Sequence, residues 1–267
     1  MAIPDAVVRA AIYPELDLPV PPPEHPFERI DRAGYSLSVF RGATFGFVSV
    51  QALLPDDIER TLAESREFFT ERGISRGAWM IPEAASPSGL AETLRARGLG
   101  SYDEPPLEPR FAAMAMIEPP PEGPGDVDAR PARTFEELRA GSHVQDDAFA
   151  MSEDDRAAFE AELQVMWEIE NRGSPFRSFV ALVDGEVVGC GGAIFGANAV
   201  HLSGGATRAD ARGRGVYRAL VRARWDEAVA QGTPALTVGA GAMSRPVLER
   251  LGFTNVGWCD CLLDRLA

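Results

Sequence analysis

The stretch Arg212-Gly213-Arg214-Gly215-Val216-Tyr217 joins an apolar run at 199–207 to a segment with helical spacing. After Gly215, apolar residues recur at i, i+3, i+4 and i+7, which predicts a helix with one buried face. The unpaired N–H groups of its first turn and the helix dipole, roughly half a positive charge, would converge on this stretch. The sequence therefore predicts an anion site at a strand-to-helix turn.

Glycine and arginine suit such a site. Glycine lets a phosphate approach the backbone because it has no Cβ, and arginine supplies a fixed positive charge. The bare pattern R-x-x-G is common, and an ordinary turn with solvated arginines is the alternative. Two contexts favour the anion site: the preceding strand ends at the expected distance, and Val247-Leu248-Glu249-Arg250-Leu251-Gly252-Phe253 follows about 30 residues after the turn, in a predicted short helix at 244–251 that ends at Gly252 after a strand at 235–238.

Together, the turn and the Leu251-Gly252-Phe253 sequence resemble the GNAT superfamily of N-acyltransferases, whose acetyl-CoA motif R/Q-x-x-G-x-G/A begins the central helix. The resemblance covers 127–267 and includes the element order: strand, two helices, three strands, helix, strand, helix, strand. It implies an α/β (α+β) fold with a mixed, mostly antiparallel central sheet flanked by helices. A second, smaller α/β GNAT-like domain would precede it, so the chain would be a tandem member with a degenerate amino-terminal half.

The resemblance also implies acetyl-CoA as co-substrate and assigns residues to it. The pantetheine arm would pair with the end of the central strand, while 236–239 splays away and leaves backbone groups unpaired. The pyrophosphate would lie on the turn. The implied cofactor-binding residues are Gly205, Ala206, Thr207, Arg212, Gly213, Arg214, Gly215, Val216, Tyr217 and Ser244.

Three positions depart from the family pattern. Tyr217 stands where the motif has glycine or alanine, and we expect its side chain to point outward while its N–H serves the phosphate. Gly241 stands where many members have asparagine. Leu248 stands where many have a tyrosine that protonates the departing thiolate. Because leucine cannot donate a proton, the acid is another residue, water or absent.

The implied reaction is direct attack of a neutral amine on the thioester in a ternary complex, and it needs a proton acceptor. The candidate catalytic residues are His201, Tyr217 and Ser244. His201 has a suitable reference pKa of about 6.5, although a lone histidine is more often structural and a water-borne route stays open. The acidic residues at 153–155 open a helix, where the dipole alone favours them.

The proline-rich stretch 118–125 cannot continue a helix or an interior strand, so it predicts a linker between domains 1–122 and 126–267. The amino-terminal elements we expect are strands at 35–40 and 45–50, a helix at 55–71, and strands near 78 and 111. The echo between Ser86-Pro87-x-x-Leu90 and Ser244-x-Pro246-x-Leu248 suggests a decayed internal repeat, although such spacing also arises by chance.

Composition excludes several function classes. The 267 residues carry a formal net charge of -14, and all 26 basic residues are arginine. Phosphate loops of the Walker type, Schiff-base enzymes and kinases need a lysine. The negative charge opposes nucleic acid and anionic membranes as partners. Three cysteines and three histidines lack zinc spacing, so we expect no metal.

Sparse cysteines and the lack of a long apolar run favour a cytoplasmic protein. We expect a monomer or homodimer whose partner is a small-molecule or peptide amine. The alternative to a transferase is a non-catalytic acyl-CoA-binding protein with a decayed active site.

Overall fold

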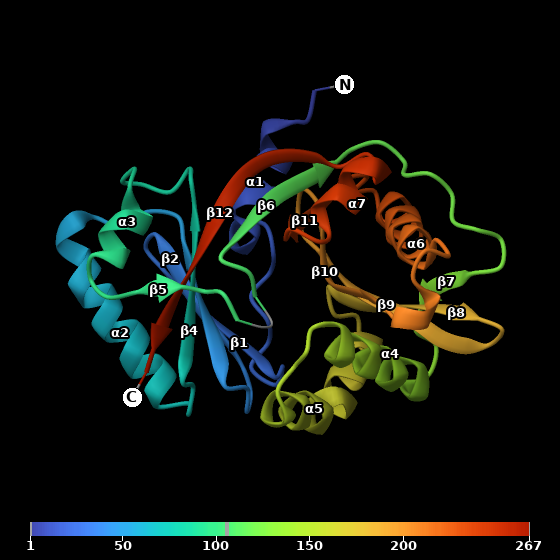
Figure 1. Ribbon diagram of the computed structural model, residues 1–267, viewed down its shortest axis with the longest axis horizontal. Helices are drawn as coiled ribbons and strands as arrows, with labels where there is room; N and C mark the ends of the chain where they lie inside the picture. The colour runs from blue at the N-terminus through green and yellow to red at the C-terminus, as the bar shows by residue number, and fades with distance from the viewer. Residues whose placement is uncertain (1, 105–106, 267) are drawn as a thin grey trace.

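A sheet of 12 strands runs through both halves of the chain in the computed structural model, which describes residues 2–104 and 107–266 (Figure 1). The strands are β1 (Phe27–Arg32), β2 (Tyr35–Phe40), β3 (Phe45–Val50), β4 (Arg76–Pro82), β5 (Gly100–Ser101), β6 (Arg110–Met116), β7 (Asp128–Pro131), β8 (Phe176–Val183), β9 (Glu186–Phe195), β10 (Val200–Thr207), β11 (Leu236–Ala240) and β12 (Thr254–Arg265). The α-helices are α1 (Asp5–Ile12), α2 (Ile58–Thr70), α3 (Leu90–Arg95), α4 (Phe135–Ala148), α5 (Glu153–Asn171), α6 (Val216–Ala230) and α7 (Arg245–Leu251). The 3-10 segments are η1 (Pro14–Leu16), η2 (Pro55–Asp57) and η3 (Ala209–Ala211).

The sheet is mixed and mostly antiparallel, which confirms the expected fold class. Its order is β1-β2-β3-β4-β12-β6-β11-β10-β9-β8-β7, with β5 paired to β12. Among the named strands, the parallel pairs are β3·β4 and β10·β11. Each parallel pair is joined by one long helix, α2 or α6, and each is followed by a short helix, α3 or α7. This shared order supports the internal repeat that the sequence suggested.

Each half of the chain contributes a strand to the part of the sheet that the other half forms. Strand β6, which precedes the linker, lies between β11 and β12 in the carboxy-terminal half. The end of β12 crosses to the amino-terminal half and pairs with β4 (Figure 1). Without these partners, β4 and β11 would each expose an edge of unpaired backbone groups. The domain limits 1–122 and 126–267 stay a prediction. Backbone hydrogen bonds join the two halves through the β6·β11, β6·β12 and β4·β12 pairs.

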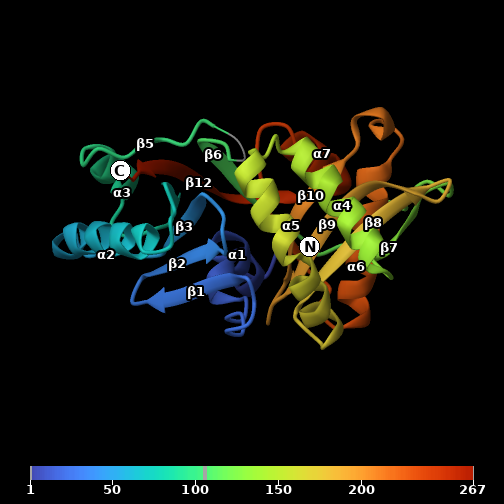
Figure 2. The same cartoon turned by 90° about the horizontal axis from the view of Figure 1, so that it is seen from below.

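Helices cover the faces of this sheet. Apolar side chains of α2 and α3 pack on β2, β3 and β4 to form one core, and those of α6 and α7 pack on β8 to β11 to form a second. Helix α4 covers the opposite face of β9 and β10, and Figure 2 shows α5 between α4 and the amino-terminal strands. Burial of one leucine or phenylalanine side chain in these cores contributes about 1.5–3 kcal/mol to the free energy of unfolding. In the described ranges, no helix has the length and apolar character that crossing a membrane requires.

Local signals in the sequence are confirmed where the structure tests them. The Asp184-Gly185 turn joins β8 and β9 with φ of 52° and 83°. The Thr134 hydroxyl accepts a hydrogen bond from the Glu137 N–H at 3.2 Å and caps α4. Strands β2 and β3 have the expected limits, whereas the helix expected at 55–71 begins with the 3-10 segment η2. Gly252 ends α7 with φ of 105°.

Candidate functional site

The turn before α6 has the backbone that a glycine-rich anion site needs. Gly213 and Gly215 both have φ of 80°, in the left-handed region where a residue with a Cβ costs about 1–2 kcal/mol. Gly215 is the N-cap of α6, and Val216 behind it is buried in the core. Arg212, Gly213 and Arg214 are exposed. The strand-to-helix turn is therefore placed as the sequence predicted, with its arginines accessible.

A cavity of about 430 Å³ opens between this turn and α7. Its lining includes both glycines of the turn and three arginines, and consists of Pro121, Gly213, Arg214, Gly215, Arg218, Val247, Arg250 and Leu251. The Nε atom of Arg218 is buried and has no hydrogen-bond partner among the described residues. In a protein with a net charge of -14, three arginines around one cavity at a helix N-terminus favour an anionic ligand.

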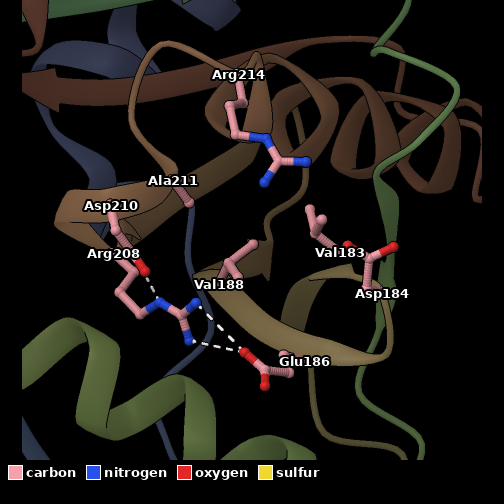
Figure 3. Close-up of a pocket in the computed structure, with 8 residues that line it drawn as sticks. All are labelled: Val183, Asp184, Glu186, Val188, Arg208, Asp210, Ala211 and Arg214. Atoms are coloured by element: carbon pink, nitrogen blue, oxygen red, sulfur yellow. Dashed lines mark hydrogen bonds and ion pairs between the residues drawn. The ribbon is translucent and has the colours of Figure 1, made fainter.

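A smaller cavity of about 230 Å³ lies on the other side of the same turn (Figure 3). There Arg208 is already paired, because its Nε donates to Asp210 at 2.7 Å and its guanidinium also reaches Glu186 at 3.4 Å. Three acidic side chains line this cavity, and Asp184 is the third. This side of the turn is the poorer match for a phosphate.

The strands β10 and β11 separate after three residue pairs, the last being Leu202 with Val238. Beyond it, β10 continues to Thr207 and β11 to Ala240 without pairing to each other. The expected splay is therefore present. The Oγ1 atom of Thr207 is buried without a hydrogen-bond partner among the described residues. An extended ligand could pair with the backbone here like an added strand.

Two implied cofactor residues next to the splay differ in orientation. Ala206 is buried and packs with Val144 and Cys190 towards α4. Gly205 faces α6, since a Cβ there would lie 2.7 Å from the Cε2 atom and 3.3 Å from the hydroxyl of Tyr217. The expectation that Tyr217 points outward is thus wrong. Its ring lies against the central strand, in the space that the absent Gly205 side chain leaves.

A buried arginine that the sequence analysis missed lies beside Tyr217. Arg224 is 1% exposed, and its guanidinium donates to the Leu220 carbonyl at 3.0 Å and the Gly192 carbonyl at 3.2 Å. Its Nη2 atom has no hydrogen-bond partner among the described residues. Burial raises the pKa of the Tyr217 phenol, and the Arg224 charge partly opposes this increase. The phenol is therefore protonated at neutral pH and can act as a proton donor.

His201, Ser244 and Leu248 differ in how far their side chains are buried. The Nδ1 atom of His201 is 3.2 Å from the Thr237 hydroxyl, and burial lowers the His201 pKa to about 4. Its imidazole is therefore neutral at pH 7. Ser244 is half-buried at the start of α7 and makes no side-chain capping bond. Leu248 is fully buried in the core, so this position offers no acid.

Glu108 is a second residue that the sequence analysis missed. It comes from the amino-terminal half, and its Oε2 atom accepts a hydrogen bond from the Ala242 N–H at 2.7 Å. A Cβ at Gly241 would overlap the Glu108 carboxylate and lie 2.5 Å from its Cδ atom. With the carboxylate in this place, position 241 has no room for a side chain such as the asparagine of the family pattern. No local pattern could have joined two positions so far apart in the chain.

Comparisons with known proteins agree with this geometry. Residues 141–253 match the model of the acetyltransferase (GNAT) family. No protein of curated function matches the chain by sequence. A GCN5-related N-acetyltransferase from Kribbella flavida has a TM-score of 0.68 at 17% identity, with 97% of this chain and 95% of that chain covered. A tandem GNAT protein from the clavulanic acid biosynthesis pathway has a TM-score of 0.61 at 15% identity, with 99% and 89% covered. At these identities the likeness shows a shared two-domain fold.

Proposed function

We propose that the protein transfers an acetyl group from acetyl-CoA to an amine, because residues 141–253 match the model of the acetyltransferase (GNAT) family. The observation that carries the proposal is the arginine-lined cavity at the turn 212–217. Its charge suits the phosphates of the cofactor, and the adjacent splay of β10 and β11 suits the extended pantetheine arm.

The chemistry follows from these positions. The amine nitrogen attacks the thioester carbonyl directly, and backbone N–H groups at the splay stabilise the oxyanion. The departing sulfur then needs a proton. Tyr217 is the acid that we assign, because its phenol lies against Gly205 in the unpaired part of β10. The acyl acceptor is a small-molecule or peptide amine.

A second function is favoured by one observation. Leu248 lies in the core where many family members have the acid, which suits an acyl-CoA-binding protein that has lost catalysis. The two functions separate when the protein is mixed with acetyl-CoA and a panel of amines while free thiol is followed. Thiol release that depends on an amine supports the transferase, and binding without release supports the alternative.

Acetyl-CoA is expected to raise the melting temperature. A ligand that binds only the native state at 100 times its Kd adds about 2.7 kcal/mol to the free energy of unfolding. For a chain of this size, this corresponds to a Tm increase of about 5–10 °C. The measurement is a thermal melt with and without the cofactor, with adenosine as a ligand that lacks the phosphates. A calorimetric titration without binding at millimolar acetyl-CoA would reject the site.

The pH profile tests Tyr217. An acid must be protonated to act, so activity is lost as pH rises through its pKa, and burial places that pKa above the ordinary value of about 10. We expect the rate to rise to a plateau and stay there up to about pH 9.5. Replacing Tyr217 with Phe keeps the ring and is expected to lower kcat about 100-fold while the Tm shift with acetyl-CoA persists. An unchanged kcat in this variant would show that Tyr217 is not the acid.

A further inference from the structure

Two positions on one face of β11, and the residue that follows the strand, have side chains from other elements next to them. Its residues Leu236, Val238 and Ala240 point into the core beneath α6 and α7. The alternate positions Thr237 and Gly239 therefore face the other side of the sheet, and Gly241 is the first residue after β11.

Each of the three has a different neighbour. His201 of β10 pairs with Thr237 in the sheet and lies beside it, with 3.2 Å between its Nδ1 atom and the hydroxyl. The Phe111 ring lies over Gly239, since a Cβ there would be 3.2 Å from its Cδ2 atom. Glu108 lies over Gly241. An imidazole, an aromatic ring and a carboxylate thus follow one another along β11.

Phe111 and Glu108 lie next to the opening where β10 and β11 separate. Beyond Val238, β11 no longer pairs with β10, so Phe111 and Glu108 border the opening. Across it, a Cβ at Gly204 would lie 3.0 Å from the Gln145 Cδ atom of α4. The arginine-lined cavity lies at the α6 and α7 side of the sheet. The opening therefore has an anion-binding side and a side with an aromatic ring and a carboxylate.

We propose that Glu108 and Phe111 bind the acyl acceptor, and that this acceptor is a positively charged amine with an apolar group next to it. The inference rests on the proposed function and extends it to the class of substrate. The half-buried carboxylate attracts an ammonium group, and the ring covers the adjoining carbon chain or stacks with the charge. The bound ammonium loses a proton to solvent before its nitrogen attacks the thioester. Both residues precede the linker, so the amino-terminal half supplies the acceptor site.

The test uses pairs of acceptors that differ by one carboxylate: phenethylamine with phenylalanine, tyramine with tyrosine, and cadaverine with lysine. A carboxylate on the acceptor is repelled by Glu108, so the wild-type protein should prefer the simple amine in each pair. Replacing Glu108 with Gln keeps an oxygen for the Ala242 N–H and removes the charge. This change should lower kcat/KM for the amines about 10- to 100-fold and reduce the preference by the same factor.

Two further variants separate charge from shape. Glu108→Asp keeps the charge and should keep the preference for the simple amine. Glu71→Gln removes a carboxylate that is 65% exposed at the C-terminus of α2, and it should change nothing. The acetyl-CoA Tm shift is measured in every variant, which shows that each one still folds and binds the cofactor.

A variant at Gly241 tests the role of Glu108 independently. Its backbone is not in the left-handed region, so Gly241→Ala is tolerated by the chain, but the new Cβ displaces the Glu108 carboxylate. Gly241→Ala should therefore reproduce the effect of Glu108→Gln. In a Glu108→Ala background the same change should have no further effect, because the new methyl group then has room.

The outcomes separate the two proposals. If no amine releases thiol from acetyl-CoA with the wild-type protein, the proposed function fails and this inference fails with it. If the wild-type protein turns over but Glu108→Gln retains the same preference within each acceptor pair, the acceptor site is elsewhere and only this inference is overturned. Additive effects of the Glu108→Ala and Gly241→Ala changes would also overturn it.

Discussion

Replacing Gly215 with Val is expected to abolish the stabilisation that acetyl-CoA gives. Gly215 has φ of 80°, and a β-branched residue in this left-handed region is strained by more than the roughly 1–2 kcal/mol of an ordinary side chain. The new Cβ would also lie 2.8 Å from the Pro124 Cγ atom. The turn must therefore change its path, and its N–H groups lose their common direction. We expect affinity for acetyl-CoA to fall at least about 100-fold, which corresponds to two phosphate hydrogen bonds.

The same helix offers a matched control. Gly232, just beyond the C-terminus of α6, has φ of 81° and nothing within 4 Å of an added Cβ. Gly232→Val therefore introduces the same backbone strain without the Pro124 contact and away from the arginine-lined cavity. It should lower the Tm of the free protein while the acetyl-CoA shift stays intact. If Gly215→Val also keeps a normal shift, the cofactor site lies elsewhere.

Gly215 has a different role in the structure from the one that the motif suggests. From the motif, a Cβ at Gly215 would be expected to fill the place of the phosphate. The structure instead directs that Cβ at Pro124 of the linker, while an added Cβ at Gly213 would meet nothing within 4 Å. We therefore expect the phosphate to lie next to Gly213 and the arginines, and we expect Gly215 to serve the site through its backbone conformation.

Elements with strong local signals could be predicted from the sequence. Turn residues separate strands β2 and β3, the Asp184-Gly185 turn specifies the β8–β9 hairpin, and Thr134 caps α4. Each signal lies within a few residues of the element that it defines. The turn at 212–217 belongs to the same group, because a single helix start and its glycines specify it.

Features that depend on distant parts of the chain could not be predicted. The insertion of β6 between β11 and β12 depends on the course of the linker, and α1, β1 and α3 are short elements of eight residues or fewer. The Gly205 space for Tyr217 and the Gly241 space for Glu108 are likewise complementary only in three dimensions. A glycine in the sequence shows freedom of the backbone, but it does not show which side chain occupies the vacant volume.

Asp155, in the acidic first turn of α5, is another residue whose role the local sequence pattern did not reveal. The helix dipole accounts for Glu153 and Asp154, which are exposed, but Asp155 is 1% exposed. Its carboxylate accepts hydrogen bonds from the Thr44 N–H at 2.7 Å and the Ser152 hydroxyl at 2.6 Å, and it lies 3.1 Å from Arg76. It thus joins α5 to the amino-terminal strands.

Replacing Asp155 with Ala is therefore expected to destabilise the protein by about 3–5 kcal/mol, because it leaves the Thr44 N–H and the Arg76 charge without this buried partner. The free energy of unfolding is measured by chemical denaturation. Asp154→Ala, at the exposed neighbouring position, is the control and should change it by less than about 0.5 kcal/mol. A loss of similar size in both variants would show that the helix dipole, rather than the contact between the halves, determines the effect.

A pH series tests the charge of this contact. Burial alone would raise the pKa of Asp155, but hydrogen bonds from Ser152 and Thr44 and the Arg76 charge outweigh it and leave the pKa below its ordinary value. A carboxyl whose native pKa is lowered contributes stability above its unfolded pKa of about 3.9, and loses it as pH falls through the native value. Asp155→Asn has the shape of the protonated acid. Its destabilisation relative to wild type should therefore be largest at pH 7 and diminish as the pH is lowered below about 4, whereas a constant difference would mean that Asp155 contributes by shape alone.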